Sequence, residues 1–216
     1  MKVVLFGATG MVGQGVLREC LRDDRVEAVL AVGRSPLGHD HPKLTEIVSD
    51  LADPGELTER LAEYDTCFFC LGVSSTGMPA EEYERITYQL TLAVAAALPE
   101  NTTFVYVSGA GTDSTERGRI RWARVKGATE NALKRLPLRT YFFRPGYIQP
   151  LHGITSKTPL YRAIYRFTTP LYPVLRRVIG GVMTTTETLG RAMIAVAERG
   201  YSQQILENTD INAAGA

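Results

Sequence analysis

Two side chains in the stretch "RIRWARVKGA" are the first in this 216-residue sequence whose types and spacing suggest chemistry. Trp122 and Lys126 stand four residues apart, so that on a helix they share one face. A tyrosine in place of the tryptophan would pair a phenol with an ammonium for proton transfer. An indole donates a hydrogen bond but has no usable acid–base equilibrium. The pair therefore leaves two interpretations: a catalytic pair without its acid, or a lysine with another purpose.

A second chemical signal is the glycine-rich stretch "VVLFGATGMVGQGVL" near the N-terminus. An apolar run leads directly into Gly7, Gly10 and Gly13, and a helical pattern begins among them. The first glycine permits a tight turn, the second lets the backbone approach a pyrophosphate, and the third lets helix and strand pack closely. The start of the helix then offers free N–H groups and a positive dipole end. This context predicts a dinucleotide-binding turn.

The residues after the second apolar run bear on which dinucleotide is bound. NAD sites usually place an acidic side chain about 20 residues past the glycines, where it binds the ribose diol. Here the sequence reads "AVGRSP", with Arg34 and Ser35 and no carboxylate until Asp40. A guanidinium suits a 2′-phosphate. The sequence therefore predicts NADP as the cofactor, with NAD the weaker alternative.

The elements that must position these groups alternate between strands and helices. Helical patterns lie at 11–21, 53–64, 80–98, 115–136 and 184–200. Strands are expected at 2–6, 26–32, 44–48, 65–72, 102–109 and 139–146, with a last edge strand at 203–206. Alternation of this kind predicts an α/β fold, a Rossmann-type doubly wound parallel sheet with a small C-terminal helical cap. We expect one NAD(P)-binding domain over 1–216, with a dinucleotide-binding core at 1–150 and the cap and C-terminal helix at 151–216.

Six short motifs together resemble the short-chain dehydrogenase/reductase superfamily. They are "GATGMVG", "SDL", "CLG", "YVSGAG", the lysine of "WARVKG", and "RPG". More closely, the chain is similar to the atypical, small NAD(P)H-binding members related to the Tat-interacting oxidoreductase-like and epimerase-like proteins. The likeness covers residues 1 to about 150 and continues more loosely to the end. It implies that Lys126 and Ser108 are the catalytic candidates.

The same resemblance implies where each part of the cofactor lies. The pyrophosphate would be held by the glycine turn, the adenosine phosphate by Arg34, and the nicotinamide ribose by Lys126. The implied cofactor-binding residues are Gly7, Thr9, Gly10, Met11, Val12, Arg34, Asp50, Leu51, Cys70, Leu71, Gly72, Ser108, Gly109, Lys126, Pro145 and Gly146.

Trp122 departs from the superfamily, in which a tyrosine at this position transfers the proton. Ser108 alone is too weak an acid to replace it at neutral pH, and only its position recommends Tyr147. Two functions therefore stay open. One is an NADP(H)-dependent reductase of a small carbonyl or quinone, with an unusual proton source. The other is a catalytically inactive, dinucleotide-sensing regulatory or interaction protein.

Charge is distributed unevenly along the chain. Residues 1–130 carry 13 basic and 19 acidic side chains, whereas residues 131–186 carry nine basic ones and no Asp or Glu. The basic stretch suggests an anionic or aromatic ligand. Its segment 157–177, with Arg162 and Arg166 on one helical face, is read as a substrate cap or as a peripheral membrane surface. No nucleic-acid-binding motif is present, so we expect no nucleic-acid partner.

Metal and compartment signals are weak. Cys67 and Cys70 would point to opposite faces of a strand, and His39, Asp40 and His41 lack a further ligand, so no metal site is expected. Three cysteines make no disulfide framework, which favours a reducing cytoplasm. No apolar run approaches the roughly 20 residues that span a bilayer. Substrate and oligomeric state stay open.

Overall fold

The centre of the molecule is one parallel sheet, formed by the short apolar runs of the sequence. The computed structural model describes residues 1–155 and 180–216. Its seven-stranded sheet has the order β3-β2-β1-β4-β5-β6-β9, which extends the order of dinucleotide-binding folds by one edge strand. The strands are β1 (Lys2–Phe6), β2 (Ala28–Gly33), β3 (Leu44–Val48), β4 (Thr66–Phe69), β5 (Thr103–Val107), β6 (Arg139–Arg144) and β9 (Ile205–Glu207). The expected α/β class is confirmed.

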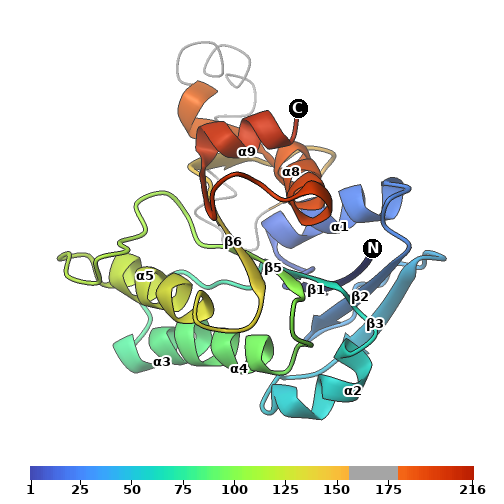
Figure 1. The fold of residues 1–216 in the computed structure, drawn as a ribbon, viewed down its shortest axis with the longest axis horizontal. Coiled ribbons are helices and arrows are strands. Elements are labelled where there is room, and N and C mark those ends of the chain that lie inside the picture. Colours follow the sequence, from blue (N-terminus) through green and yellow to red (C-terminus); the bar gives the residue numbers. More distant parts are fainter. Residues whose placement is uncertain (156–179) are drawn as a thin grey trace.

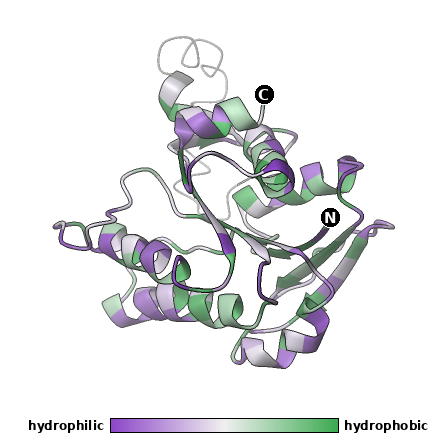
Figure 2. Cartoon of the chain, in the orientation of Figure 1, coloured by the Kyte–Doolittle hydropathy of each residue, from purple (hydrophilic) through white to green (hydrophobic). Residues whose placement is uncertain are grey.

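Helices cover both faces of this sheet (Figure 1). On one face, α1 (Met11–Arg22), α8 (Thr186–Arg199) and α9 (Asn208–Ala214) enclose an apolar cluster that includes Val16, Phe68 and Met193. The opposite face is covered by α3 (Ala80–Glu84), α4 (Leu90–Ala96), α5 (Arg121–Leu133), the 3-10 turn η1 (Pro54–Leu57) and α2 (Thr58–Leu61). Figure 2 shows the consequence: the strands are apolar, and polar residues lie on the outer sides of the helices.

Two expected helices are shorter than their sequence patterns indicate. The 115–136 helix begins only at Arg121, because the Asp113 carboxylate accepts hydrogen bonds from the backbone N–H groups of Thr115 and Gly118 and holds the preceding stretch as a turn. The 53–64 helix consists of η1 and one turn of α2. The 80–98 helix is interrupted between α3 and α4 by a π-helical turn, η2 (Arg85–Gln89).

A small second sheet brings together the described segments that precede residue 156 and follow residue 179. Strand β7 (Tyr147–Gln149) pairs in parallel with β8 (Met183–Thr185), which follows the 3-10 turn η3 (Gly180–Val182). Neither this sheet nor α9 was predicted from the sequence. The helical C-terminal region is confirmed, whereas the segment 157–177 with Arg162 and Arg166 lies outside the described residues.

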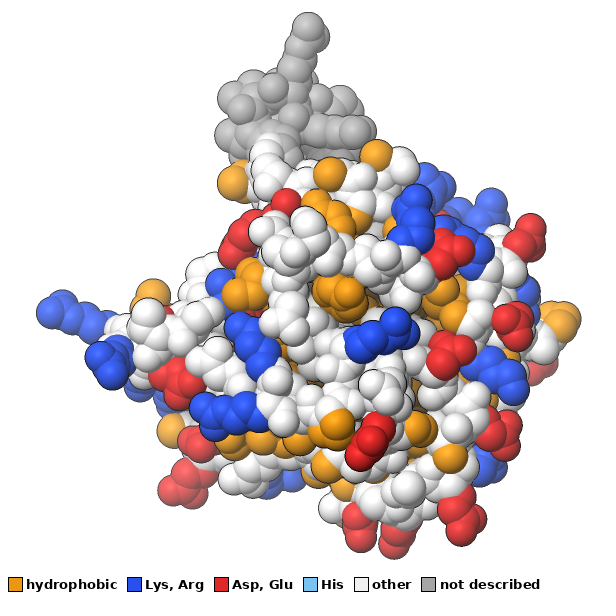
Figure 3. Space-filling model, viewed as in Figure 1, with side chains coloured by type: hydrophobic (Ala, Val, Ile, Leu, Met, Phe, Trp, Pro, Cys, Tyr) orange, Lys and Arg blue, Asp and Glu red, His pale blue; other side chains and the backbone are white. Residues whose placement is uncertain are grey.

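Acidic and basic side chains occupy separate areas of the described surface. In Figure 3, acidic side chains gather over α2, and basic side chains gather at the loop that precedes α5. Arg144 belongs to the acid-free stretch 131–186 but is not a surface residue. Its side chain is only 10% exposed and forms an ion pair with Glu130. None of the helices within 1–155 and 180–216 is long and apolar enough to cross a membrane.

Candidate functional site: a dinucleotide groove

A cavity of about 540 Å³ lies at the carboxyl ends of β1, β2 and β4. Ligands of open parallel sheets bind at this edge, where the strand order reverses. Eleven residues that the sequence analysis selected line it: Gly7, Thr9, Gly10, Met11, Arg34, Asp50, Leu51, Cys70, Leu71, Gly72 and Lys126. The structure thus gathers residues from five separate sequence motifs around one cavity.

The glycine turn is shaped as the sequence predicts. Gly7 has φ +84°, and a Cβ atom there would lie 2.6 Å from the backbone nitrogen of Leu71. At Gly13 a Cβ would lie 2.0 Å from the carbonyl oxygen of Gly7, so helix α1 approaches the turn as closely as a glycine permits. The N-cap residue of α1 is Gly10, with no side-chain cap and no acidic residue in the first turn. The N–H groups of this turn can therefore serve an anionic ligand.

The end of the cavity at β2 and β3 contains a carboxylate that the sequence analysis missed. Arg34 and Ser35 line this end, as does Glu46 from β3. One oxygen of Glu46, Oε2, accepts a hydrogen bond of 2.8 Å from the backbone N–H of Leu37. The sequence signal for such an acid is a carboxylate directly after β2, and none stands there before Asp40. Glu46 reaches the same place because β3 is the parallel neighbour of β2, with Ala31 opposite Glu46.

At the other end of the cavity, Lys126 is the charged side chain that α5 supplies. Its ammonium donates a hydrogen bond to the backbone carbonyl of Ser108, at the end of β5. Burial lowers the pKa of Lys126 to about 8, and the negative charge of Glu130 opposes this shift. The lysine is thus fixed in place by the strand that carries Ser108.

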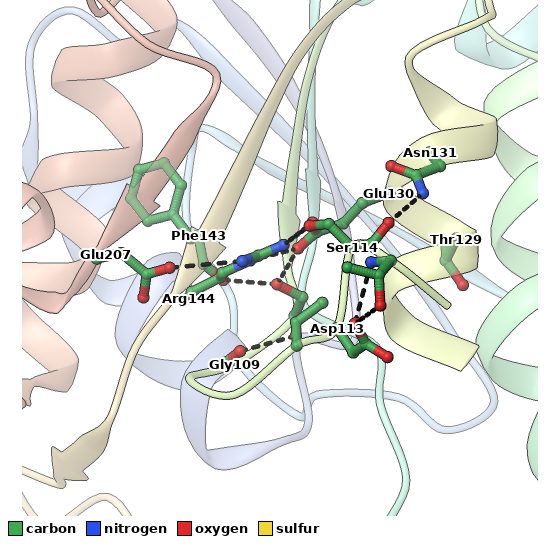
Figure 4. A network of polar contacts seen from close by, with 12 residues as sticks. Gly109, Asp113, Ser114, Thr129, Glu130, Asn131, Phe143, Arg144 and Glu207 are labelled. Carbon is green, nitrogen blue, oxygen red and sulfur yellow. Dashed lines mark hydrogen bonds and ion pairs between the residues drawn. The ribbon is translucent and has the colours of Figure 1, made fainter. Parts of the chain in front are cut away.

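Ser108 takes part in a buried polar network that Figure 4 shows from close by. Its hydroxyl donates to Oε1 of Glu130 at 2.6 Å, and Nε of Arg144 donates to the same oxygen at 3.1 Å. The Glu130 side chain is fully buried, and Arg144 reaches it from the end of β6. Nη2 of Arg144 also donates to the Ser114 hydroxyl at 2.6 Å. The Ser108 hydroxyl therefore faces a carboxylate in this structure.

Trp122 lies in the first turn of the same helix but contacts a different neighbour from Lys126. Its ring atom Cη2 is 3.4 Å from the position that a Cβ atom would occupy at Gly111. Gly109 and Gly111 both have positive φ, and they form the turn that follows β5. The tryptophan does not belong to the lining of the cavity. The indole thus packs on the turn after β5.

Five residues that the resemblance implied for the cofactor lie outside this lining: Val12, Ser108, Gly109, Pro145 and Gly146. The "RPG" motif instead joins neighbouring elements. The Pro145 carbonyl accepts a hydrogen bond from the Ala110 N–H at 2.9 Å. The Gly146 N–H donates to the side chain of Asn208 at 3.1 Å.

Other residues of the cavity and its surroundings were missed by the sequence analysis. Arg85 and Ile86 line the cavity from the π-helical turn. Such turns are frequent at functional sites, but a regular helical pattern in the sequence does not reveal them. Glu130, four residues after Lys126, carried no recognisable signal except that spacing.

The candidate metal ligands do not come together. Cys67 is buried in the core of one sheet face, while Cys70 packs against the core of the other. His41 accepts a hydrogen bond from the Lys43 N–H in its own loop. The described residues contain no group of three or more His, Cys, Asp and Glu side chains that would hold a metal ion.

Comparisons with known proteins agree with this geometry. A family model described as NAD(P)H-binding matches residues 7–158. The mitochondrial protein fmp52-2 of Aspergillus terreus is 27% identical over 199 residues, which cover 89% of this chain and 85% of the relative. HTATIP2 of Rattus norvegicus is 26% identical over 152 residues, covering 68% and 62%. The enzyme WbmF of Bordetella bronchiseptica, solved with NAD+ and UDP, shares the fold with a TM-score of 0.68 at 17% identity, over 98% of this chain and 75% of that one.

The same relatives correct one expectation of the sequence analysis, the cytoplasmic location. The fmp52-2 protein is named mitochondrial, and so are further fungal relatives. The expectation was wrong because a low cysteine count argues against a disulfide framework but does not distinguish one reducing compartment from another.

The family match covers the glycine turn, the lysine helix and the "RPG" strand, which are the elements that surround the cavity. A nicotinamide dinucleotide, NAD or NADP, is thus the cofactor class of this fold. The chain belongs to the NAD(P)H-binding family and is an oxidoreductase-like protein of the atypical short-chain dehydrogenase/reductase type.

Proposed function

We propose that this protein is an NADP(H)-dependent reductase of a small carbonyl or quinone compound. The observation that carries the proposal is one cavity lined by Arg34, the glycine turn and Lys126. The resemblance to the short-chain superfamily implies that Arg34 would meet the 2′-phosphate, the glycine turn the pyrophosphate and Lys126 the nicotinamide ribose. A bound dinucleotide would supply the hydride.

Different residues of the cavity would bind different parts of the dinucleotide. The backbone of Thr9, Gly10 and Met11 would hold the pyrophosphate, and Arg34 with Ser35 would hold the 2′-phosphate. Asp50 and Leu51 would lie beside the adenine, with Cys70, Leu71 and Gly72 along the groove. Lys126 would bind the ribose hydroxyls, while Ser108 and Gly109 with Pro145 and Gly146 would frame the nicotinamide.

Two contacts favour a second candidate function, a dinucleotide-responsive regulatory protein without turnover. The Ser108 hydroxyl is hydrogen-bonded to Glu130, and Trp122 packs on Gly111 where the superfamily has its tyrosine. Neither group is then placed to protonate a substrate. The two candidates share the cofactor site and differ only in chemistry.

Cofactor choice is tested by Arg34→Ala. We expect the variant to lose about 1–3 kcal/mol of NADPH affinity, the range for a charge-assisted hydrogen bond, and to bind NADH almost as the wild type does. Isothermal titration calorimetry with each reduced cofactor measures both values. Arg60→Ala, an arginine on α2 outside the cavity lining, is the matched control. Equal wild-type affinities for NADPH and NADH would contradict the NADP assignment.

Turnover separates the two candidate functions. Wild type and Trp122→Tyr are incubated with NADPH and a panel of aldehydes, ketones and quinones, and the loss of nicotinamide absorbance is followed. A reductase is expected to consume NADPH with at least one substrate, faster in Trp122→Tyr if the phenol restores the proton donor. Tight NADPH binding with no turnover by either protein would support the regulatory function instead.

A further inference from the structure

The starting observation is the position of Glu46 at the adenosine end of the cavity. It lies on the edge strand β3, directly opposite Ala31 of β2, and lines the same space as Arg34 and Ser35. A carboxylate at this end is of interest because the two dinucleotides differ there alone: NAD has a ribose diol where NADP has a phosphate.

One hydrogen bond gives Glu46 a structural role as well as a charge. Its Oε2 atom accepts the N–H of Leu37 at 2.8 Å, and the Leu37 side chain packs against the apolar cluster beside α1. Leu37 lies three residues after Arg34, in the loop 34–43 that connects β2 with β3. Glu46 therefore holds the loop that carries the proposed phosphate-binding residues.

The hydrogen bond of Glu46 supports the loop that carries Arg34, whereas its negative charge disfavours a phosphate beside Arg34. A backbone N–H leaves the negative charge of the carboxylate uncompensated, unlike a guanidinium. A 2′-phosphate beside Arg34 would be repelled by this charge, whereas a ribose diol can donate a hydrogen bond to a carboxylate. We infer that Glu46 is a specificity-determining residue that opposes Arg34 and keeps the preference of this groove for NADPH over NADH small. This inference rests on the proposed dinucleotide function.

Glu46→Gln separates the charge from the loop contact, because the amide oxygen of glutamine can still accept the Leu37 N–H. We expect the NADPH dissociation constant to fall about three- to tenfold, while that of NADH changes by less than about twofold. Calorimetric titrations of both cofactors, at low and at high salt, measure the effect. The gain for NADPH should shrink at high salt, since screening weakens the repulsion that the substitution removes.

Glu59→Gln on α2, which removes a carboxylate outside the cavity lining, is the matched control and should leave the ratio of the two constants unchanged. Thermal unfolding of each variant checks that the fold is retained. An unchanged ratio in Glu46→Gln, with wild type still binding a dinucleotide, would overturn the role of Glu46 and leave the proposed function standing. Wild type that binds neither cofactor would overturn both.

Discussion

The two ends of the groove are built in different ways. At the glycine turn and Arg34, the groups that face the cavity are backbone N–H donors and an exposed arginine, placed by local turn geometry. At the Lys126 end, the lysine donates a hydrogen bond to the Ser108 carbonyl. The Ser108 hydroxyl in turn donates to Glu130, which forms a buried ion pair with Arg144.

This difference indicates which end of the groove tolerates a departure from the superfamily sequence. The first end follows the superfamily motif closely, because a pyrophosphate cradle needs glycines and a helix start wherever it occurs. The second end departs from the superfamily sequence at Trp122, although the buried network of Ser108, Glu130 and Arg144 is present there. The buried framework is thus retained at the end where Trp122 stands in the position of the superfamily tyrosine.

The largest effect is expected from removing one member of the buried pair. Glu130→Leu leaves the Arg144 guanidinium buried without its carboxylate, and it should lower the free energy of unfolding by about 3–5 kcal/mol. Urea unfolding followed by circular dichroism measures the loss. We expect the position of Lys126 to depend on the Glu130–Arg144 pair, whereas the glycine turn does not. NADPH binding should therefore weaken even in conditions where the variant stays folded.

The double variant Glu130→Leu with Arg144→Met sharpens this test. Replacing both charges by apolar groups of similar size is often close to neutral for stability, so most of the loss should be recovered. A double variant as unstable as Glu130→Leu alone would mean that the pair matters through packing and not through its charges.

A smaller effect is expected at the glycine end. Gly13→Ala puts a Cβ atom 2.0 Å from the Gly7 carbonyl oxygen, so helix α1 must shift, at a cost of about 1–3 kcal/mol. Calorimetric titration should show that dinucleotide binding weakens as well, since the same shift moves the N–H groups of the turn. Gly181→Ala is the control, because a Cβ there meets no atom within 4 Å and Gly181 lies outside the cavity lining. Equal stability losses in the two variants would argue against the close contact at Gly13.

The smallest effect is a pH dependence that arises from Lys126. Its folded pKa of about 8 lies below the usual 10.5, so the unfolded chain binds more protons between these values. The stability of wild type relative to Lys126→Met should therefore rise from pH 8 to pH 10.5, by on the order of 1 kcal/mol after solvent screening. Urea unfolding of both proteins across this range measures the difference, and a difference that stays constant would contradict the lowered pKa.

The sequence was sufficient to predict the sheet and the glycine turn, because both depend on local patterns. Apolar runs mark every strand of the main sheet, and the positive φ of Gly7 follows from the turn that its motif requires. The start of α5 was misplaced because Asp113 stabilises a turn through its side chain, a contact that competes with helix formation.

Long-range pairings account for what the sequence did not reveal. Glu46 reaches the adenosine end through the register of β3 with β2, and Glu130 meets Arg144 only after β5, α5 and β6 have packed. Neither residue stands in a motif. Their roles come from partners that are distant in the sequence or belong to another element.

The pairing of β7 with β8 has an evolutionary consequence. Because Tyr147 and Met183 lie side by side in register, the chain returns to the point at which it left the main sheet. The entropy of closing such an excursion grows slowly with its length, by about 0.6 kcal/mol for each doubling. Insertions and deletions between these two strands therefore put little strain on the dinucleotide groove. The chain length between β7 and β8 can therefore change while the register of the two strands is kept.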